Sequence, residues 1–374
     1  MTLTGRTESP TPDTRTEPVS VLILARYGSR AASTRYRLLQ YLPFLERHGF
    51  TFTINTLLDD VYIQNLYSGK TQDPRRIAAS YVQRVSTLVR SGHVDLIWMH
   101  IEAFPWVPAW WEQQVIPSGV PYVIDLDDAM YHRYDEHRLP FVRVALGKKI
   151  DSLMKKSALV VAGNQYIADR AQKAGAREIS IVPTVVDLEK YRIKQDHPVD
   201  PPQTVVGWIG SPATAYNLQL MRPALGQLSL EQKIRLVSVG SGEIDMGPGI
   251  NHEVRGWSEN TEVSDILSFD IGTMPLVDSS FERGKSGFKL IQCMACGLPV
   301  VASPVGVNTN IVTDRLTGFI AASSNDWYNS LRALARDSRL RQEMGAAGRE
   351  RVERHYSLQH SAPRLAGLLR DAVR

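Results

Sequence analysis

The stretch from residue 281 to 306 constrains the fold of this chain most strongly. A loop that contains Gly284 and Gly287 leads into a helical pattern of about three turns. Gly297 and Pro299 are placed to end this helix, because glycine favours the C-terminal cap and proline cannot continue a helix. The run 299–302 that follows is short, apolar and rich in valine, which is typical of a buried parallel strand. Loop, helix and buried strand in this order predict an α/β fold with a parallel sheet.

The polar residues of this predicted helix share one face. Lys285, Lys289 and Gln292 stand at positions i, i+4 and i+7. Two lysines one turn apart repel each other unless an anion lies between them, and the N-terminus of a helix is itself positive. A diphosphate fits these features, and Gly284 and Gly287 would let it approach the backbone closely. A solvated lysine pair on a surface helix is the alternative interpretation.

Length and composition limit the class of protein. A chain of 374 residues is expected to form two domains. The net charge of +4 is too mild to indicate a nucleic-acid partner. The two cysteines, Cys293 and Cys296, lack the second ligand pair of a zinc site and suggest no disulfide framework, which fits a reducing cytoplasm. We find no membrane-spanning apolar run and no signal-peptide core.

The α/β pattern occurs twice along the chain. We predict a disordered tail at 1–18, a first Rossmann-like domain at 19–193, a proline-containing linker at 194–203 and a second such domain at 204–356, with a final helix at 357–374. Strands are expected at 19–24, 51–55, 94–99, 121–128, 159–162 and 179–183, and again at 204–210, 235–240, 251–257, 270–276, 299–302 and 318–321. Two such halves place a cleft at their boundary.

Four arginines surround the first predicted strand-to-helix loop, and Ser33 or Thr34 is expected to cap the helix there. Arginine at a helix N-terminus opposes the helix dipole, so its presence there suggests a carboxylate or phosphate ligand. We predict that an acidic acceptor binds these arginines, and the alternative is that some of them face water. The four are Arg26, Arg30, Arg35 and Arg37.

Further candidates follow two later strands. His100 ends a strand at the sheet edge where ligands bind in open α/β folds, although a lone histidine is more often structural. Asp125, Asp127 and Asp128 end the next strand, where they either bind a divalent cation or, as we favour, bond to backbone N–H groups and arginines. The basic helical region 133–156 is compatible with an anionic membrane surface, and also with a solvated helix face.

The segment 287–303 resembles the C-terminal signature of GT-B glycosyltransferases of the family 4 type, the glycosyl transferases group 1. Its most specific part runs from Met294 to Ser303, and the similarity extends to 274–276, 256–257 and 316–319. The resemblance implies two Rossmann-like domains facing across a cleft, with the last helix crossing back to the N-terminal domain. It also implies a nucleotide-diphosphate sugar in the C-terminal domain, an acceptor in the N-terminal domain, and retention of anomeric configuration without a metal or other cofactor.

Carried over residue by residue, the resemblance implies that His100 reaches the donor sugar. Lys285 and Lys289 are expected to hold the leaving diphosphate. Gln292 takes the place of the second glutamate of the family's E-x7-E motif, and Gly284 takes the place of the first. The residues expected to bind the donor are Gly28, Gly210, Ser211, Gly256, Trp257, Pro275, Glu282, Ser286, Gly287, Phe288 and Gln292.

These features together predict a cytoplasmic enzyme that transfers a sugar from a GDP- or UDP-linked donor. The acceptor is expected to be an acidic or hydroxylated small molecule, lipid or glycan, and peripheral contact with the inner membrane face is compatible with the basic region. Ser211 stands where members carry an arginine and lysine pair, and Lys285 and Lys289 are expected to supply that charge. The missing glutamates favour one alternative, a catalytically silent GT-B protein that binds a nucleotide or a partner. A GT-B sugar epimerase is another.

Overall fold

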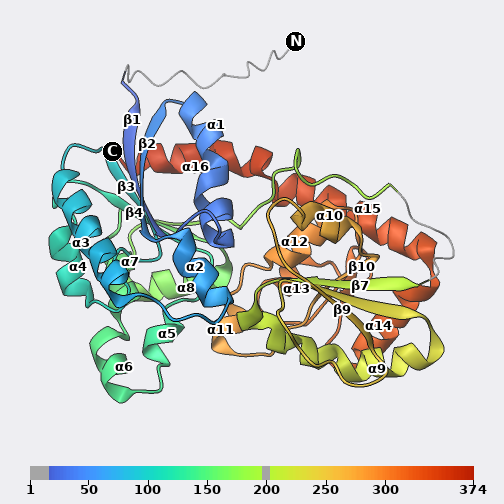
Figure 1. Cartoon of the computed structure of the whole chain (residues 1–374). Coiled ribbons are helices and arrows are strands. Elements are labelled where there is room, and N and C mark those ends of the chain that lie inside the picture. The colour runs from blue at the N-terminus through green and yellow to red at the C-terminus, as the bar shows by residue number, and fades with distance from the viewer. Residues whose placement is uncertain (1–16, 196–202) are drawn as a thin grey trace, which may run out of the picture.

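The structure, a computed structural model, describes residues 17–195 and 203–374. The predicted tail and linker lie almost entirely outside these residues, so the domain boundaries stay predictions. We refer to the two sheets with their covering helices as the N-terminal lobe and the C-terminal lobe (Figure 1).

The N-terminal lobe contains a sheet of six parallel strands in the order β2-β1-β3-β4-β5-β6. Its strands are β1 (Val19–Tyr27), β2 (Phe50–Leu58), β3 (Leu96–His100), β4 (Tyr122–Leu126), β5 (Leu159–Ala162) and β6 (Ile179–Ile181). Each was predicted from the sequence; the inner strands β1, β3, β4 and β5 are covered on both faces and read as continuous apolar runs, whereas the edge strands β2 and β6 are partly exposed. The order reverses between β1 and β3, and ligands of doubly wound folds bind outside the carboxyl ends of strands at such a switch point.

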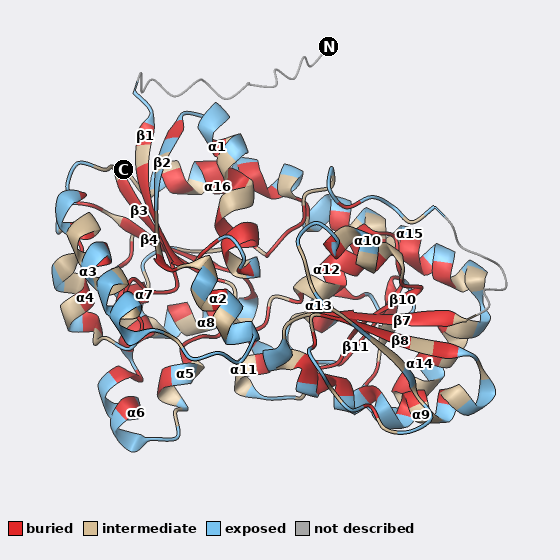
Figure 2. Cartoon of the chain, viewed as in Figure 1, coloured by how far each residue is buried: buried red, intermediate tan, exposed pale blue. Residues whose placement is uncertain are grey.

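The C-terminal lobe repeats this plan with the order β12-β11-β10-β7-β8-β9. Its strands are β7 (Thr204–Ile209), β8 (Ile234–Val239), β9 (Asn251–Arg255), β10 (Ile271–Met274), β11 (Val300–Ala302) and β12 (Gly318–Ile320). Figure 2 shows that the inner strands of both sheets are buried, whereas the edge strands β2, β6 and β9 are largely intermediate or exposed. The predicted doubly wound α/β class is therefore confirmed.

Helices cover both faces of each sheet. In the N-terminal lobe these are η1 (Thr34–Leu38), η2 (Leu39–Tyr41), α1 (Leu42–Arg47), α2 (Asp60–Tyr67), α3 (Pro74–Arg90), α4 (Ala109–Val115), α5 (His132–Asp135), α6 (Pro140–Leu146), α7 (Lys149–Lys156) and α8 (Gln165–Ala174). In the C-terminal lobe they are η3 (Pro212–Met221), α9 (Arg222–Glu231), α10 (Glu262–Leu267), α11 (Ser280–Arg283), α12 (Phe288–Ala295), α13 (Asn308–Ile311), α14 (Ser324–Arg336) and α15 (Ser338–His355).

The last helix, α16 (Leu358–Asp371), crosses back to the N-terminal lobe, as expected. Its residues Leu365 and Leu369 join the apolar cluster that contains Ile23 and Trp98 of the first sheet. In Figure 1 this helix, in red, lies beside β1 and α1, far from the C-terminal sheet that precedes it in the chain. The buried leucines tie the two ends of the chain together.

Two local predictions were wrong. The helix expected after the first loop begins with a π-helical turn, η1, and the side chains of Ser33 and Thr34 do not cap it. The hydroxyl of Thr34 instead donates a hydrogen bond to the carbonyl oxygen of Tyr27. The helix expected near residue 285 is also shorter than about three turns, because α12 begins only at Phe288.

Candidate active site

A cavity of about 620 Å³ lies between the two lobes. Most of the predicted site residues line it: Arg30, Arg35, Gly210, Ser211, Gly256, Trp257, Lys285, Ser286, Gly287, Phe288, Lys289 and Gln292. The remaining ones do not: Gly28, His100, Pro275, Glu282, Arg26 and Arg37. Because both lobes contribute to its walls, the cavity can hold two ligands against each other.

The loop before α12 places Lys285 differently from the prediction. Gly287 has a left-handed φ of 66°, which turns the chain immediately before the helix. An ideal Cβ at Gly287 would lie 2.2 Å from Cδ1 of Ile311, so a side chain is excluded here. Lys285 therefore stands in the loop, whereas Lys289 and Gln292 belong to α12. The expectation of one shared helix face was wrong, yet all three residues line the same cavity.

The two lysines differ in their charged neighbours. The Nζ of Lys285 lies 3.6 Å from Oδ2 of Asp128 and 3.8 Å from Oε2 of Glu282. Burial acts to lower the pKa of Lys285, but these carboxylates outweigh it and the pKa is raised. The two carboxylates thus largely compensate the positive charge of the Lys285 ammonium group.

Lys289 is compensated less. Its Nζ lies 5.3 Å from the ring centre of Trp208, and among the described residues no carboxylate forms an ion pair with it. Burial, reinforced by the charge of Lys285, lowers the pKa of Lys289 to about 8, against the weaker opposing effect of Asp128 and Glu282. A partly buried cation without an ion-pair partner is stabilised when an anion arrives. Backbone N–H groups of the first turn of α12 also lack intrahelical partners, so this corner of the cavity favours an anionic ligand.

The N-terminal lobe fixes the loop that carries Lys285. The side-chain amide of Asn164 donates hydrogen bonds to the carbonyl oxygens of Gly284, at 2.8 Å, and Lys285, at 3.3 Å. The carbonyl of the same side chain caps α8 by accepting from the N–H of Ile167. The loop is therefore held by a residue that is itself fixed in the facing lobe.

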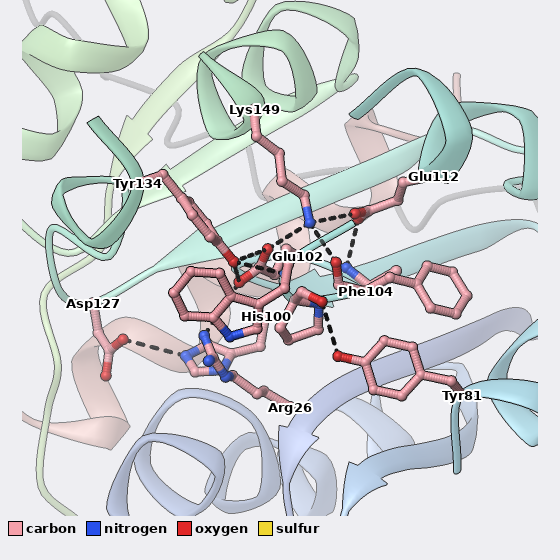
Figure 3. A network of polar contacts seen from close by, with 12 residues as sticks. Arg26, Tyr81, His100, Glu102, Phe104, Glu112, Asp127, Tyr134 and Lys149 are labelled. Atoms are coloured by element: carbon pink, nitrogen blue, oxygen red, sulfur yellow. Dashed lines mark hydrogen bonds and ion pairs between the residues drawn. The ribbon is translucent and has the colours of Figure 1, made fainter. Parts of the chain in front are cut away.

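His100 is buried beside the cavity and forms a pair with Asp127. Its Nε2 lies 3.2 Å from Oδ1 of Asp127, and its Nδ1 is buried without a hydrogen-bond partner (Figure 3). Burial acts to raise the pKa of Asp127, but the hydrogen bond and charge of His100, with Arg37, lower it. Asp127 lines the cavity. His100 does not line the cavity itself, but it contacts Asp127, which does.

Arg26 and Arg37 form buried ion pairs within the N-terminal lobe. The Nη1 of Arg26 lies 3.2 Å from Oε1 of Glu102, in the network of Figure 3. The Nε of Arg37 donates to Asp125 at 2.7 Å, and its Nη1 donates to the carbonyl oxygen of Val182. Since both arginines are buried and neither lines the cavity, the prediction that they bind an acceptor finds no support.

Arg30 and Arg35 do line the cavity, with one arginine that the sequence reasoning missed. The guanidinium of Arg35 lies 4.6 Å from the ring centre of Trp257 across the cleft. A nucleobase received on that face of Trp257 must therefore displace Arg35. Arg133, on α5, is exposed and lines the same cavity. The sequence showed Arg133 only as part of a basic region, without its position at the cleft.

Gln292 belongs to a hydrogen-bond network that spans the two lobes. Its side-chain N–H donates to the hydroxyl of Tyr191 at 2.8 Å. The carboxylate of Glu262 accepts from Tyr191, Tyr36 and the indole N–H of Trp257. Glu262 lines the cavity and was not predicted. Its place five residues after Trp257, in the first turn of α10, was the only signal in the sequence.

The three aspartates after β4 each contact a different basic group: Asp125 contacts Arg37, Asp127 contacts His100 and Asp128 contacts Lys285. Their arrangement agrees in part with the favoured interpretation, because one of the three bonds to an arginine. Among the described residues, the group of three or more that fits a metal ion lies elsewhere, at 132, 135 and 136.

Comparison with known proteins agrees with this architecture. Residues 203–337 match the family Glycosyl transferases group 1. The chain is similar, over 95% of its own length and 98% of the other, to the structure of sucrose-phosphate synthase from Thermosynechococcus elongatus, with a TM-score of 0.70 and 15% identity. The structure of HepE from Anabaena in complex with UDP has a TM-score of 0.69 and 16% identity over 94% of this chain and all of that one.

The chain has the GT-B fold, and its C-terminal lobe resembles the glycosyl transferases group 1 family. Two relatives are D-inositol 3-phosphate glycosyltransferases. That of Segniliparus rotundus is 25% identical over 60% of this chain, and that of Stackebrandtia nassauensis is 30% identical over 28% of it. The matches span 56% and 23% of the lengths of these relatives.

The structure explains one departure from the group 1 motif. An ideal Cβ at Gly284 would lie 2.2 Å from Cβ of Ala129 and 2.9 Å from its backbone nitrogen. The facing lobe therefore leaves no room for a glutamate where the motif places its first one. Glu282 does not replace it in the cavity, since its Oε1 accepts from the hydroxyl of Tyr216 and the residue is buried outside the lining.

Proposed function

We propose that this GT-B protein transfers a sugar from a nucleotide-diphosphate donor, linked to UDP or GDP, to an acceptor held by the N-terminal lobe. The observation that carries the proposal is Lys289, a partly buried cation without an ion-pair partner among the described residues, at the N-terminus of α12 and in the lining of the cavity between the lobes. HepE, which shares the fold, has been solved with UDP and with UDP-glucose, and this supports a sugar nucleotide as the donor.

In this proposal the diphosphate occupies the corner formed by Lys289, Ser286 and the first amides of α12. Charge that develops on the leaving diphosphate meets fixed donors there, which is the kind of electrostatic stabilisation that contributes most to many enzymes. Lys285 adds less, since Asp128 and Glu282 already compensate it. His100 would orient the sugar through its contact with Asp127.

Retention of configuration follows as part of the proposal from the carboxylates of the cavity. Asp127 contacts His100, Asp128 contacts Lys285, and Glu262 accepts three hydrogen bonds. None of them is free to attack the sugar as a nucleophile. We therefore favour a front-face reaction, in which an oxygen of the departing diphosphate takes the proton of the acceptor hydroxyl and no metal takes part.

The acceptor would meet a cationic and partly apolar wall. Arg30 and Arg133 line the cavity on the N-terminal side, next to Ile63, Leu66 and Tyr67 of α2. This wall suits an acceptor that carries both an acidic group and hydroxyl groups. Two relatives are named for an inositol phosphate, which is an acceptor of that chemical kind.

A thermal-shift panel with UDP, GDP, ADP and TDP tests the donor assignment, because a ligand that binds only the folded state raises the melting temperature. We expect UDP or GDP to raise it in a concentration-dependent way. If none of the four does so up to millimolar concentration, a nucleotide-sugar donor is excluded.

A catalytically silent nucleotide-binding protein is the second candidate, and it is favoured by the glycine and glutamine at positions 284 and 292. Slow hydrolysis of the donor without acceptor, measured as release of free nucleotide diphosphate, separates the two. The transferase predicts hydrolysis that depends on Lys289, whereas the silent protein predicts binding without hydrolysis.

A further inference from the structure

A second surface of the N-terminal lobe has the composition of a docking site. Three exposed apolar side chains lie on α6 or directly before it, Leu139, Phe141 and Val144, and a fourth, Trp106, packs against His137, two residues before Leu139. The exposed fraction is 51% for Trp106, 68% for Phe141 and 88% for Val144. Figure 1 shows α6 standing away from both sheets, at the end of the segment that follows α5. We refer to these four residues as the apolar tip.

The base of the apolar tip is rigid. The ring of Trp106 packs edge-on against Tyr134, with ring centres 5.2 Å apart, and the backbone N–H of Trp106 donates to the hydroxyl of Tyr134. That hydroxyl donates in turn to Glu102, which also binds the buried ammonium group of Lys149 at 2.6 Å (Figure 3). Trp106 has a left-handed φ of 64°, which is strained for a bulky residue. The N-terminal lobe therefore holds the indole ring of Trp106 half-exposed, although the left-handed backbone of this residue is unfavourable.

Positive charge surrounds the tip. Arg133, Arg138, Arg143 and Lys148 are all exposed between α5 and the start of α7. The acidic residues of the same region are already engaged, since Asp135 contacts His132 and Arg170, and Glu136 contacts His132 and Ser280. Among the described residues, this surface thus combines projecting apolar side chains with cations that lack nearby acidic partners.

We propose that the apolar tip inserts shallowly into an anionic lipid surface, with the surrounding cations contacting lipid phosphates. A projecting surface of this kind fits the interface of a bilayer, which accepts aromatic and aliphatic side chains below a layer of negative headgroups. A protein groove is the competing occupant, but it gives no reason for the surrounding cations. Within the described residues no helix is long and apolar enough to cross a membrane, so the contact would be peripheral.

Docking in this way would bring the cavity close to the lipid. Arg133 belongs both to the cationic surround of the tip and to the cavity lining. An acceptor with its anionic group at the membrane surface would then reach the cavity from the side of α5. Membrane docking does not depend on the proposed sugar transfer, because it rests on residues that lie outside the donor corner.

Flotation of the full chain with vesicles tests the docking. We expect the protein to float with vesicles of 70% phosphatidylcholine and 30% phosphatidylglycerol, and not with phosphatidylcholine alone. The double variant Phe141→Ser/Val144→Ser should reduce the partition coefficient about tenfold or more, because burial of these side chains drives insertion. Arg138→Gln/Lys148→Gln should reduce it at low salt only. The matched control is Val82→Ser/Val89→Ser, which alters two exposed valines of α3 in the same lobe.

A fluorescent probe on the apolar tip distinguishes insertion into the bilayer from electrostatic attraction to its surface. Val144→Cys can be labelled with an environment-sensitive dye, because Cys293 and Cys296 are buried. Dye emission should shift to the blue on addition of anionic vesicles, and dye at Leu230→Cys, on an equally exposed residue of the C-terminal lobe, should not respond. The proposal is overturned if the tip variants float like the wild type or if the dye stays in water. It is also overturned if the chain forms a stable dimer that Phe141→Ser/Val144→Ser dissociates, since a second copy would then cover the tip. Melting curves of each variant verify that it folds.

Discussion

Replacement of Lys289 by methionine is the sharpest test of the donor corner. Methionine keeps an apolar stem over the ring of Trp208 and beside Gly210, where a Cβ would lie 2.7 Å from Cε of the lysine. The variant therefore removes the ammonium charge with little change in packing. Its fold should be about as stable as the wild type, because the partly buried cation of Lys289 is desolvated and has no ion-pair partner among the described residues.

The magnitude follows from Coulomb's law. A unit charge about 4 Å from a diphosphate charge is worth roughly 4 kcal/mol at the effective dielectric of a partly open site. Part of this is offset by the desolvation of both groups, which leaves about 1.5 to 4 kcal/mol. Turnover and nucleotide affinity should therefore fall by roughly ten-fold to a thousand-fold.

Isothermal titration with UDP and GDP measures the loss of affinity, and release of nucleotide diphosphate from the sugar donor measures the loss of turnover. Lys233→Met, on an exposed lysine that is absent from the cavity lining, is the matched control and should behave like the wild type. Unchanged affinity and turnover in Lys289→Met would refute the reasoning.

Three further outcomes follow from the structure. Because the pKa of Lys289 is lowered to about 8 in the empty site, nucleotide affinity should fall by up to about tenfold per pH unit above pH 8, as the free protein loses the proton that the complex needs. Gly284→Ala should lower the melting temperature, since its Cβ would meet Ala129 at 2.2 Å and overpacking costs about 1 to 3 kcal/mol. Lys149→Met should destabilise the N-terminal lobe by about 3 kcal/mol or more, because it leaves Glu102 buried beside a second acid without this cation.

Each of these outcomes has a control. The pH dependence should disappear in Lys289→Met, and a fall in affinity that persists there would assign it to another group. Gly92→Ala is the match for Gly284→Ala, since a Cβ at Gly92 meets nothing within 4 Å. An unaltered melting curve for Lys149→Met would show that the buried acids are neutral in the folded state.

The inner strands were predictable from the sequence because burial on both faces leaves a simple apolar pattern. All twelve lie within the predicted runs or extend them by a few residues. The loop before α12 was harder, because Gly287 takes a left-handed φ of 66° and lies against Ile311, which follows it by more than twenty residues. The helical spacing of Lys285, Lys289 and Gln292 is the same in the sequence whether or not the chain turns at Gly287.

The site was predictable where a local motif marked it, as near residues 30, 210, 256 and 285. The lysines and glycines near 285 reach the cavity together, since they are neighbours in the chain. Arg26 and Arg37 look like ligand-binding residues in the sequence, but their carboxylate partners are 76 and 88 residues away, so their burial could not be foreseen. Glu262 and Arg133 were missed for the same reason, because only the folded chain brings them to the cleft.

A crystal structure with a bound sugar nucleotide tests the central claim most directly. The account predicts diphosphate oxygens within hydrogen-bond distance, about 3 Å, of the N–H of Ser286 and of Nζ of Lys289. A diphosphate bound instead against Arg30 and Arg133, with Lys289 left without an anion, would contradict it.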